Sequence, residues 1–134
     1  MVVKIPLAVL LFAAGCVALV SALELLGRGE RKGASPGALR AIHRVAGYAF
    51  AALLVALVAL GVRRLSVTGD QIPLRAVFHV VLALGVVALL LIKVVVTRFY
   101  RQLLRLAPAL GLSLFVLTLV VVAITAGFEA ATGR

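Results

Sequence analysis

Four long runs of hydrophobic residues, separated by short polar stretches, cover most of the chain. They lie at residues 5–23, 45–62, 76–92 and 106–128 and contain no Asp, Glu, Lys or Arg. Each run is close to the roughly 20 residues that a helix needs to cross about 30 Å of hydrocarbon. Because every backbone polar group in lipid must be hydrogen-bonded within the protein, these runs are expected to be α-helices.

Turn and cap residues between the runs set the expected ends of the helices. Ser35 followed by Pro36 is typical of a helix start, with a hydroxyl cap and a proline in the first turn. Pro73 and Pro108 mark two further starts, and residues 64–72 read as a short loop with a Gly-Asp turn. The expected fold class is all-α, an integral membrane four-helix bundle with up-down-up-down topology. A single transmembrane domain over residues 1–134 would have helices at about 4–26, 37–63, 73–104 and 108–128.

Composition supports a membrane protein and argues against nucleic acid as a partner. Hydrophobic residues make up 65% of the 134, more than a soluble domain of this size can cover. The net charge is +10, but the basic residues flank the hydrophobic runs, which favours contact with lipid headgroups. They are not interleaved with the aromatic residues that stack on single-stranded nucleic acid. The first expected partner is therefore the lipid bilayer.

The distribution of basic residues predicts the orientation. Nine of the 14 Lys and Arg residues lie in or beside the first and third connections, and five lie on the opposite side. The excess places those two connections in the cytoplasm, with the N and C termini outside, in a prokaryotic inner membrane.

Two intramembrane histidines, His43 and His79, are the main candidates for chemistry. Each is followed four residues later, on the same helix face, by a small residue, Gly47 or Ala83. Neutral imidazole is a good iron ligand, and a small residue one turn away leaves room for a flat macrocycle. This pattern predicts haem b with His43 and His79 as the metal ligands. The alternative is that each histidine only hydrogen-bonds water, a carbonyl or a lipid phosphate.

Basic residues near the histidines complete the expected cofactor site. Arginines in the first turns of the second and third helices could pair with haem propionates: Arg40, Arg44 and Arg75. Lys93 follows His79 by 14 residues and therefore lies on roughly the same helix face. It is a candidate sixth ligand or propionate partner, although snorkelling toward the headgroups competes with both roles.

The motif His43-Arg44-x-x-Gly47-Tyr48, with Arg75-x-x-x-His79 and the later Lys93 and Arg98, resembles small bacterial membrane cytochromes b with a four-helix core. The broader likeness is to cytochrome b561-type proteins and covers the middle half of the chain. The resemblance implies histidine-ligated haem b that passes electrons between a quinol or redox partner and a second acceptor. Any enzymatic role would be that of an oxidoreductase component, with quinone as a further candidate cofactor.

The histidine count and depth predict that the chain does not act alone. Such cytochromes usually supply two histidines per haem, whereas this chain has two in total. At about 1.5 Å per residue the two lie roughly 20 Å apart in depth, on opposite sides of the membrane centre. Two axial ligands of one iron need nearly the same depth. A homodimer that pairs each histidine with its own copy, or a hetero-complex with a redox partner, would supply the missing ligands.

Other functional classes fit the residues less well. A proton or cation transporter would need a carboxylate near the middle of the membrane, and Glu24 lies too close to an edge. A membrane hydrolase is disfavoured because the sequence shows no Asp/Glu–His pair, no cluster of metal ligands and no Ser with a base within reach in sequence. A haem-free structural or anchor subunit of a larger membrane complex fits everything except the histidines.

Overall fold

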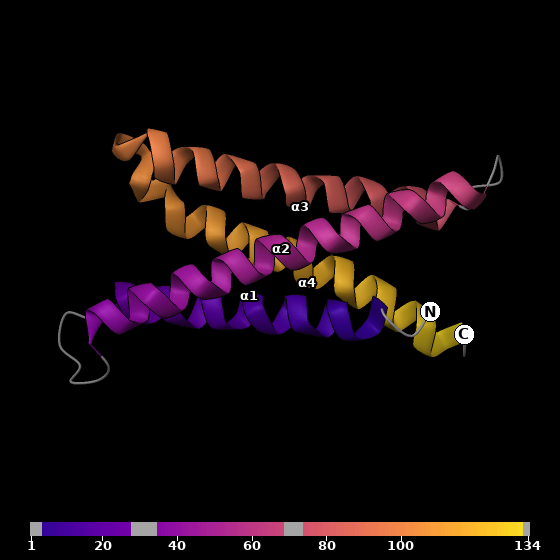
Figure 1. Cartoon of the computed structure of the whole chain (residues 1–134), viewed down its shortest axis with the longest axis horizontal. Coiled ribbons are helices and arrows are strands. Elements are labelled where there is room, and N and C mark those ends of the chain that lie inside the picture. Colours follow the sequence, from indigo (N-terminus) through magenta and orange to yellow (C-terminus); the bar gives the residue numbers. More distant parts are fainter. Residues whose placement is uncertain (1–3, 28–34, 69–73, 133–134) are drawn as a thin grey trace. The chain divides into compact units, whose positions relative to one another are not determined.

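The computed structural model describes residues 4–27, 35–68 and 74–132. These residues form four long α-helices and one 3-10 helix (Figure 1). In chain order they are α1 (Lys4–Leu26), α2 (Pro36–Thr68), α3 (Leu74–Phe99), η1 (Arg101–Leu106) and α4 (Ala107–Thr132). The predicted all-α, four-helix class is confirmed. Backbone contacts divide the chain into two compact units, Met1–Val55 and Ala56–Arg134, and the expected single domain stays a prediction.

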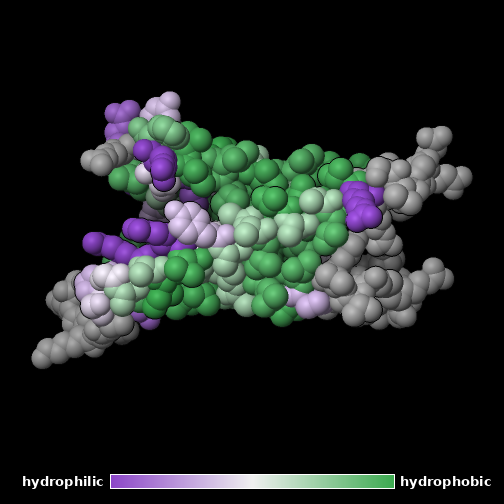
Figure 2. Space-filling view, viewed as in Figure 1, coloured by the Kyte–Doolittle hydropathy of each residue, from purple (hydrophilic) through white to green (hydrophobic). Residues whose placement is uncertain are grey.

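All four α-helices are long and apolar enough to cross a membrane. The candidate spans are Pro6–Leu26, Pro36–Arg63, Ala76–Phe99 and Gln102–Thr125. Large apolar side chains along them are exposed, among them Val55, Phe78 and Leu112, as expected where the surrounding solvent is lipid. Figure 2 shows hydrophobic side chains along the middle of the helices and hydrophilic ones near their ends. The chain is a multi-pass membrane protein whose surface contacts the bilayer.

The predicted start of the second helix is confirmed in its capping geometry. The side-chain Oγ of Ser35 accepts a hydrogen bond from the backbone N–H of Ala38 at 3.3 Å. The Ser35 carbonyl accepts one from the N–H of Leu39 at 3.2 Å. Pro36, which has no N–H to donate, occupies the first helical position, where that donor would be unpaired in any case.

Three predicted helix ends were wrong. α2 continues to Thr68 rather than ending near residue 63, because a helix does not have to stop where its apolar span stops, and Arg and Leu are good helix formers. α3 ends at Phe99 rather than near residue 104, because Tyr100 has φ −116° and ψ 74°, outside the helical region. α4 runs on to Thr132, with no breaker between residues 128 and 132. The expected turn at residues 69–70 and the start at Pro73 lie outside the described residues.

Unit 1 contains α1 and the first part of α2 as a helical hairpin (Figure 1). The two helices are antiparallel, because Ala18 and Ser21 in the second half of α1 contact His43 near the start of α2. Together with His43, the buried apolar side chains of α2 recur at intervals of three or four residues, at Leu39, Ala46, Phe50 and Leu54. His43 therefore occupies a position on the buried stripe of α2.

Unit 2 contains α3, η1 and α4, which pack against one another. The pairing is antiparallel along its length, since His79 near the start of α3 contacts Thr125 on α4, and Lys93 near the end of α3 lies against Gly111. The two helices approach closely where a methyl carbon added at Gly85 would lie 3.3 Å from Leu117 Cδ2. Such close approach at a small residue is how transmembrane helices gain packing contacts in lipid.

The contacts between His79 and Thr125 and between Lys93 and Gly111 mark the two ends of an α3–α4 seam. The seam is defined by these four residues together with Val86 and Thr118, which lie seven residues from them on α3 and α4. Val86 is 2% exposed and Thr118 is 3% exposed, so the middle of the seam is its most buried part. A seven-residue repeat on both partners is the spacing of coiled-coil-like helix packing.

Candidate functional site

His43 is held against α1 through one nitrogen of its ring. Its Nδ1 lies 2.8 Å from the backbone carbonyl oxygen of Ala18. A carbonyl oxygen can only accept a hydrogen bond, so a contact this short requires Nδ1 to carry a proton and donate it. In the neutral ring the lone pair is then on Nε2, the nitrogen that a metal or an external donor would meet.

Ser21 completes the group around His43 and is almost fully buried, at 3% exposure. Its hydroxyl donates to the same Ala18 carbonyl at 3.0 Å, while its oxygen lies 3.3 Å from Nδ1 of His43. The single hydroxyl proton is thus directed to the carbonyl rather than to the imidazole. Ala18, Ser21 and His43 form one hydrogen-bonded cluster, called here the His43 cluster.

The surroundings of His43 agree with space for a flat ligand on the same helix. A methyl carbon added at Gly47, one turn beyond, would meet no atom within 4 Å. Arg40 and Arg44 flank the histidine in the first turns of α2, and both side chains are exposed. The described part of this site therefore combines an oriented imidazole, an open position and two cationic side chains.

His79 has a related arrangement on the second hairpin. Its Nδ1 lies 3.3 Å from Oγ1 of Thr125 on α4. Thr125 donates its hydroxyl proton to the carbonyl of Val121, four residues earlier, at 2.8 Å. Since the hydroxyl proton is used in the shorter bond, the oxygen faces Nδ1 as an acceptor. His79 and Thr125 are both exposed, so this site is more open than the His43 cluster.

An apolar groove of about 410 Å³ lies beside His79. The other residues that line it are hydrophobic and come from α3 and α4: Leu74, Phe78, Leu82, Val121 and Ile124. This volume is in the range of small-molecule sites, which are mostly apolar with a few placed polar groups. Ala83, the expected small neighbour of His79, is half-buried and is not among the lining residues. The side chain of Arg75 lies outside the described residues.

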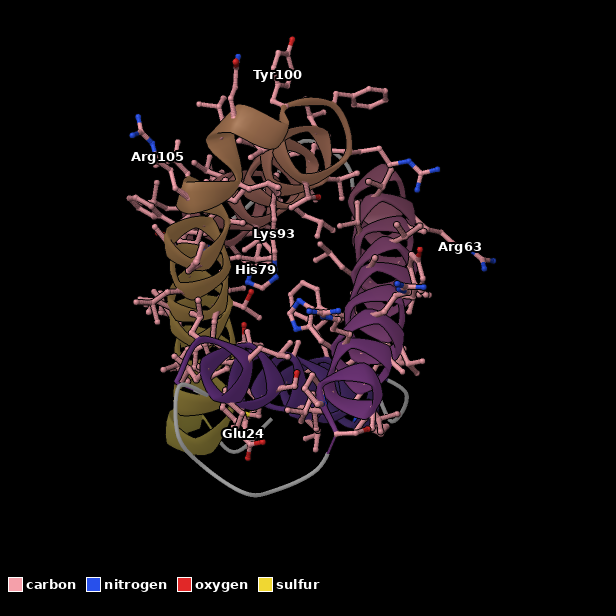
Figure 3. All side chains as sticks on the ribbon, turned by 90° about the vertical axis from the view of Figure 1, so that its left-hand side faces the viewer. Glu24, Arg63, His79, Lys93, Tyr100 and Arg105 are labelled. Atoms are coloured by element: carbon pink, nitrogen blue, oxygen red, sulfur yellow. The ribbon has the colours of Figure 1, made fainter. Side chains whose placement is uncertain are left out.

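Lys93 and His79 share the side of α3 that faces α4, as expected from their spacing (Figure 3). A methyl carbon added at Gly111 would lie 3.3 Å from Nζ of Lys93, so the ammonium lies in the seam at the level of Gly111. Tyr100 and Arg105 point away from α3 and α4 in the same view. The missing side chain of Gly111 makes room for the lysine.

The sequence did not predict Ala18 and Ser21 as neighbours of His43. It therefore also did not predict that a serine hydroxyl lies close to a histidine. Ser21 and His43 are 22 residues apart, and Thr125 and His79 are 46 apart. Each pair is placed almost symmetrically about the connection between its two helices. A search for polar residues mirrored across the connections would have found both hydroxyls.

A site built only from protein ligands is not supported in the described part of the chain. Residues 4–27, 35–68 and 74–132 contain no group of three or more His, Cys, Asp or Glu residues placed to hold a metal ion. A haem supplies four nitrogen ligands of its own and needs the protein only for axial ligands. Comparison of the chain with protein-family models, curated proteins and solved structures gives no match.

Proposed function

We propose that this protein binds haem b through His43 and His79 and transfers electrons within the membrane. The single observation that carries the proposal is the 2.8 Å contact between Nδ1 of His43 and the Ala18 carbonyl. Histidines that ligate metals almost always donate their other ring N–H to a carbonyl, carboxylate or water. The His43 cluster has this arrangement, with Nδ1 of His43 donating to the Ala18 carbonyl.

The residues present fit haem in their chemistry. The protonated Nδ1 leaves Nε2 of His43 as the donor atom, Gly47 leaves an open position one turn away, and Arg40 and Arg44 offer charge to carboxylates. His79 contributes a second imidazole beside an apolar groove, with Nδ1 against Thr125. When bound, haem would supply a one-electron redox centre. The protein would hold and orient the imidazoles and surround them with apolar side chains.

The proposal includes an assembly larger than one chain. Each hairpin offers one histidine, and electron-transfer haems of the b type generally use two axial ligands. A homodimer would supply the second ligand at each level, and a hetero-complex with a redox partner is the alternative. Quinone is the proposed donor or acceptor, and the proposed location is a prokaryotic inner membrane with both termini outside. A reporter that is active only in the cytoplasm, fused to the C-terminus, should therefore give no signal, and a strong signal would contradict this orientation.

The contact between Ser21 and His43 suggests a second functional class to consider, a serine hydrolase that uses a Ser–His pair. In such a pair the imidazole must accept the serine proton. Here the nearest nitrogen, Nδ1, already carries a proton that it donates to Ala18, and the Ser21 proton goes to the same carbonyl. A buried hydroxyl without a base is not an activated nucleophile, so the geometry argues against hydrolysis.

Reduced-minus-oxidised absorption spectra of the purified protein test the haem proposal. The wild type should show a Soret band and a sharp α band. His43→Ala and His79→Ala should each reduce or shift them. Gly47→Leu should lower the haem content by filling the open position. Gly61→Leu is the matched control, because Gly61 is on the same helix and its added carbon also meets nothing within 4 Å. A wild type without haem, or unchanged spectra in both histidine variants, would favour the alternative of a haem-free anchor subunit.

A further inference from the structure

We infer that the two histidines are held in the same tautomer by two different devices, a backbone carbonyl at His43 and a threonine hydroxyl at His79. Ala18 locks His43, Ser21 adjusts the strength of that lock, and Thr125 positions His79. Their consequence for a bound haem rests on the proposed function, whereas the tautomers are a property of the protein alone.

The lock at His43 follows from the hydrogen-bonding capacity of the carbonyl. If Nδ1 carried the lone pair, two acceptors would face each other across 2.8 Å without a proton between them. Because that arrangement leaves both groups without a hydrogen bond at a part-buried contact, the tautomer with the proton on Nδ1 is strongly favoured. The carbonyl belongs to the backbone, so the lock does not depend on the side chain at residue 18.

Ser21 acts on the strength of the lock and not on its direction. A carbonyl in a helix interior already accepts one backbone N–H, and its oxygen has two lone pairs. The Ala18 oxygen also faces the Ser21 hydroxyl at 3.0 Å and His43 Nδ1 at 2.8 Å. Three donors therefore share two lone pairs. Removing the serine hydroxyl should strengthen the bond from Nδ1, which makes the imidazole more basic.

The device at His79 is weaker because a hydroxyl can change roles. Thr125 accepts from Nδ1 only as long as its own proton stays on the Val121 carbonyl. The Thr125 oxygen lies 2.8 Å from the Val121 carbonyl oxygen and 3.3 Å from His79 Nδ1. Because the first distance is shorter, the hydroxyl proton is expected on the side of the carbonyl. Replacing Thr125 by alanine removes this acceptor from Nδ1. Thr125→Ala should therefore weaken the preference of His79 for the proton on Nδ1.

Nitrogen-15 NMR of histidine-labelled protein in bicelles, without added haem and at about pH 8.5, measures both tautomers directly. Both tautomers are forms of the neutral ring, so the spectra are recorded about two units above 6.5, the pKa of a free histidine. His43→Gln and His79→Gln assign the signals. In the wild type both histidines should carry the proton on Nδ1. Ser21→Ala should leave His43 in that form. Thr125→Ala should lower the Nδ1-protonated fraction of His79, and Thr125→Ser should restore it.

Several outcomes would overturn the inference. They are a wild-type His43 protonated on Nε2, a switch of His43 in Ser21→Ala, or an unchanged His79 in Thr125→Ala. The wild-type spectrum needs no substitution, so the inference is testable even if a variant fails to fold.

For protein that carries haem, the midpoint potential gives a second readout. Ser21→Ala should lower the potential of the haem at His43 and Ser21→Thr should restore it, whereas a purely structural role would change the yield but not the potential. If no haem binds, the proposed function fails while the tautomers still decide this inference.

Discussion

Replacing Val86 by alanine tests whether the α3–α4 seam holds the second hairpin together. Val86 is 2% exposed and lies midway between His79 and Lys93 on the seam. The matched control is Val81→Ala on the same helix. It removes the same atoms at a lipid-facing position, because Val81 is 59% exposed. Any gain in helix propensity from valine to alanine is common to both variants.

The magnitude follows from the bilayer as solvent. In water, removing two methylene equivalents would cost transfer free energy and leave a cavity. In lipid the transfer contribution is close to zero, because the acyl chains are as apolar as the protein interior. The cavity of about 50 Å³, at about 24 cal/mol per Å³, leaves about 1 kcal/mol. Val86→Ala should therefore lose about 1 kcal/mol more than Val81→Ala, a factor of about five in the equilibrium constant.

Equilibrium unfolding in mixtures of mild detergent and dodecyl sulfate, followed by circular dichroism and repeated by steric trapping in bicelles, measures this difference. Equal losses in the two variants would show that Val86 packs no more tightly than a lipid-facing valine. That result would refute the assignment of the seam.

Three further substitutions follow from contacts in the structure. Thr118→Val should change stability by less than about 0.5 kcal/mol in the same unfolding assay, because the Thr118 hydroxyl donates only to the Leu114 carbonyl of its own helix, at 2.7 Å. Thr118→Phe should disrupt the seam, because the larger side chain does not fit there. Gly111→Leu should destabilise the hairpin by displacing the Lys93 amine, and Lys93→Ala in the same chain should restore part of the loss; additive losses would contradict the contact. Ser35→Ala should cost about 0.5–2 kcal/mol and speed hydrogen exchange in the first turn of α2, whereas Ser35→Asp should retain protection.

The sequence alone determined which segments are helical, for a reason specific to membranes. A backbone in hydrocarbon has no water to bond, so an apolar run of about 20 residues has one available solution, the helix. Local chemistry also placed the start of α2, because the Ser35 cap and Pro36 act within one turn. The shared face of His79 and Lys93 followed from helical periodicity. The C-terminal ends of α2 and α3 could not be predicted in this way. In α2 helix-forming residues extend the helix beyond the apolar span, and α3 ends where the backbone of Tyr100 leaves the helical region.

Only the tertiary structure decided which residues face the histidines. Each helix is apolar on nearly all sides, so no polar stripe marks the rotation of one helix against the next. In lipid there is also no hydrophobic force to bury one face rather than another. The register is then set by close packing and by a few interhelical hydrogen bonds. For this reason the neighbours of the two imidazoles, the carbonyl of Ala18 and the hydroxyls of Ser21 and Thr125, could be identified only from the paired helices.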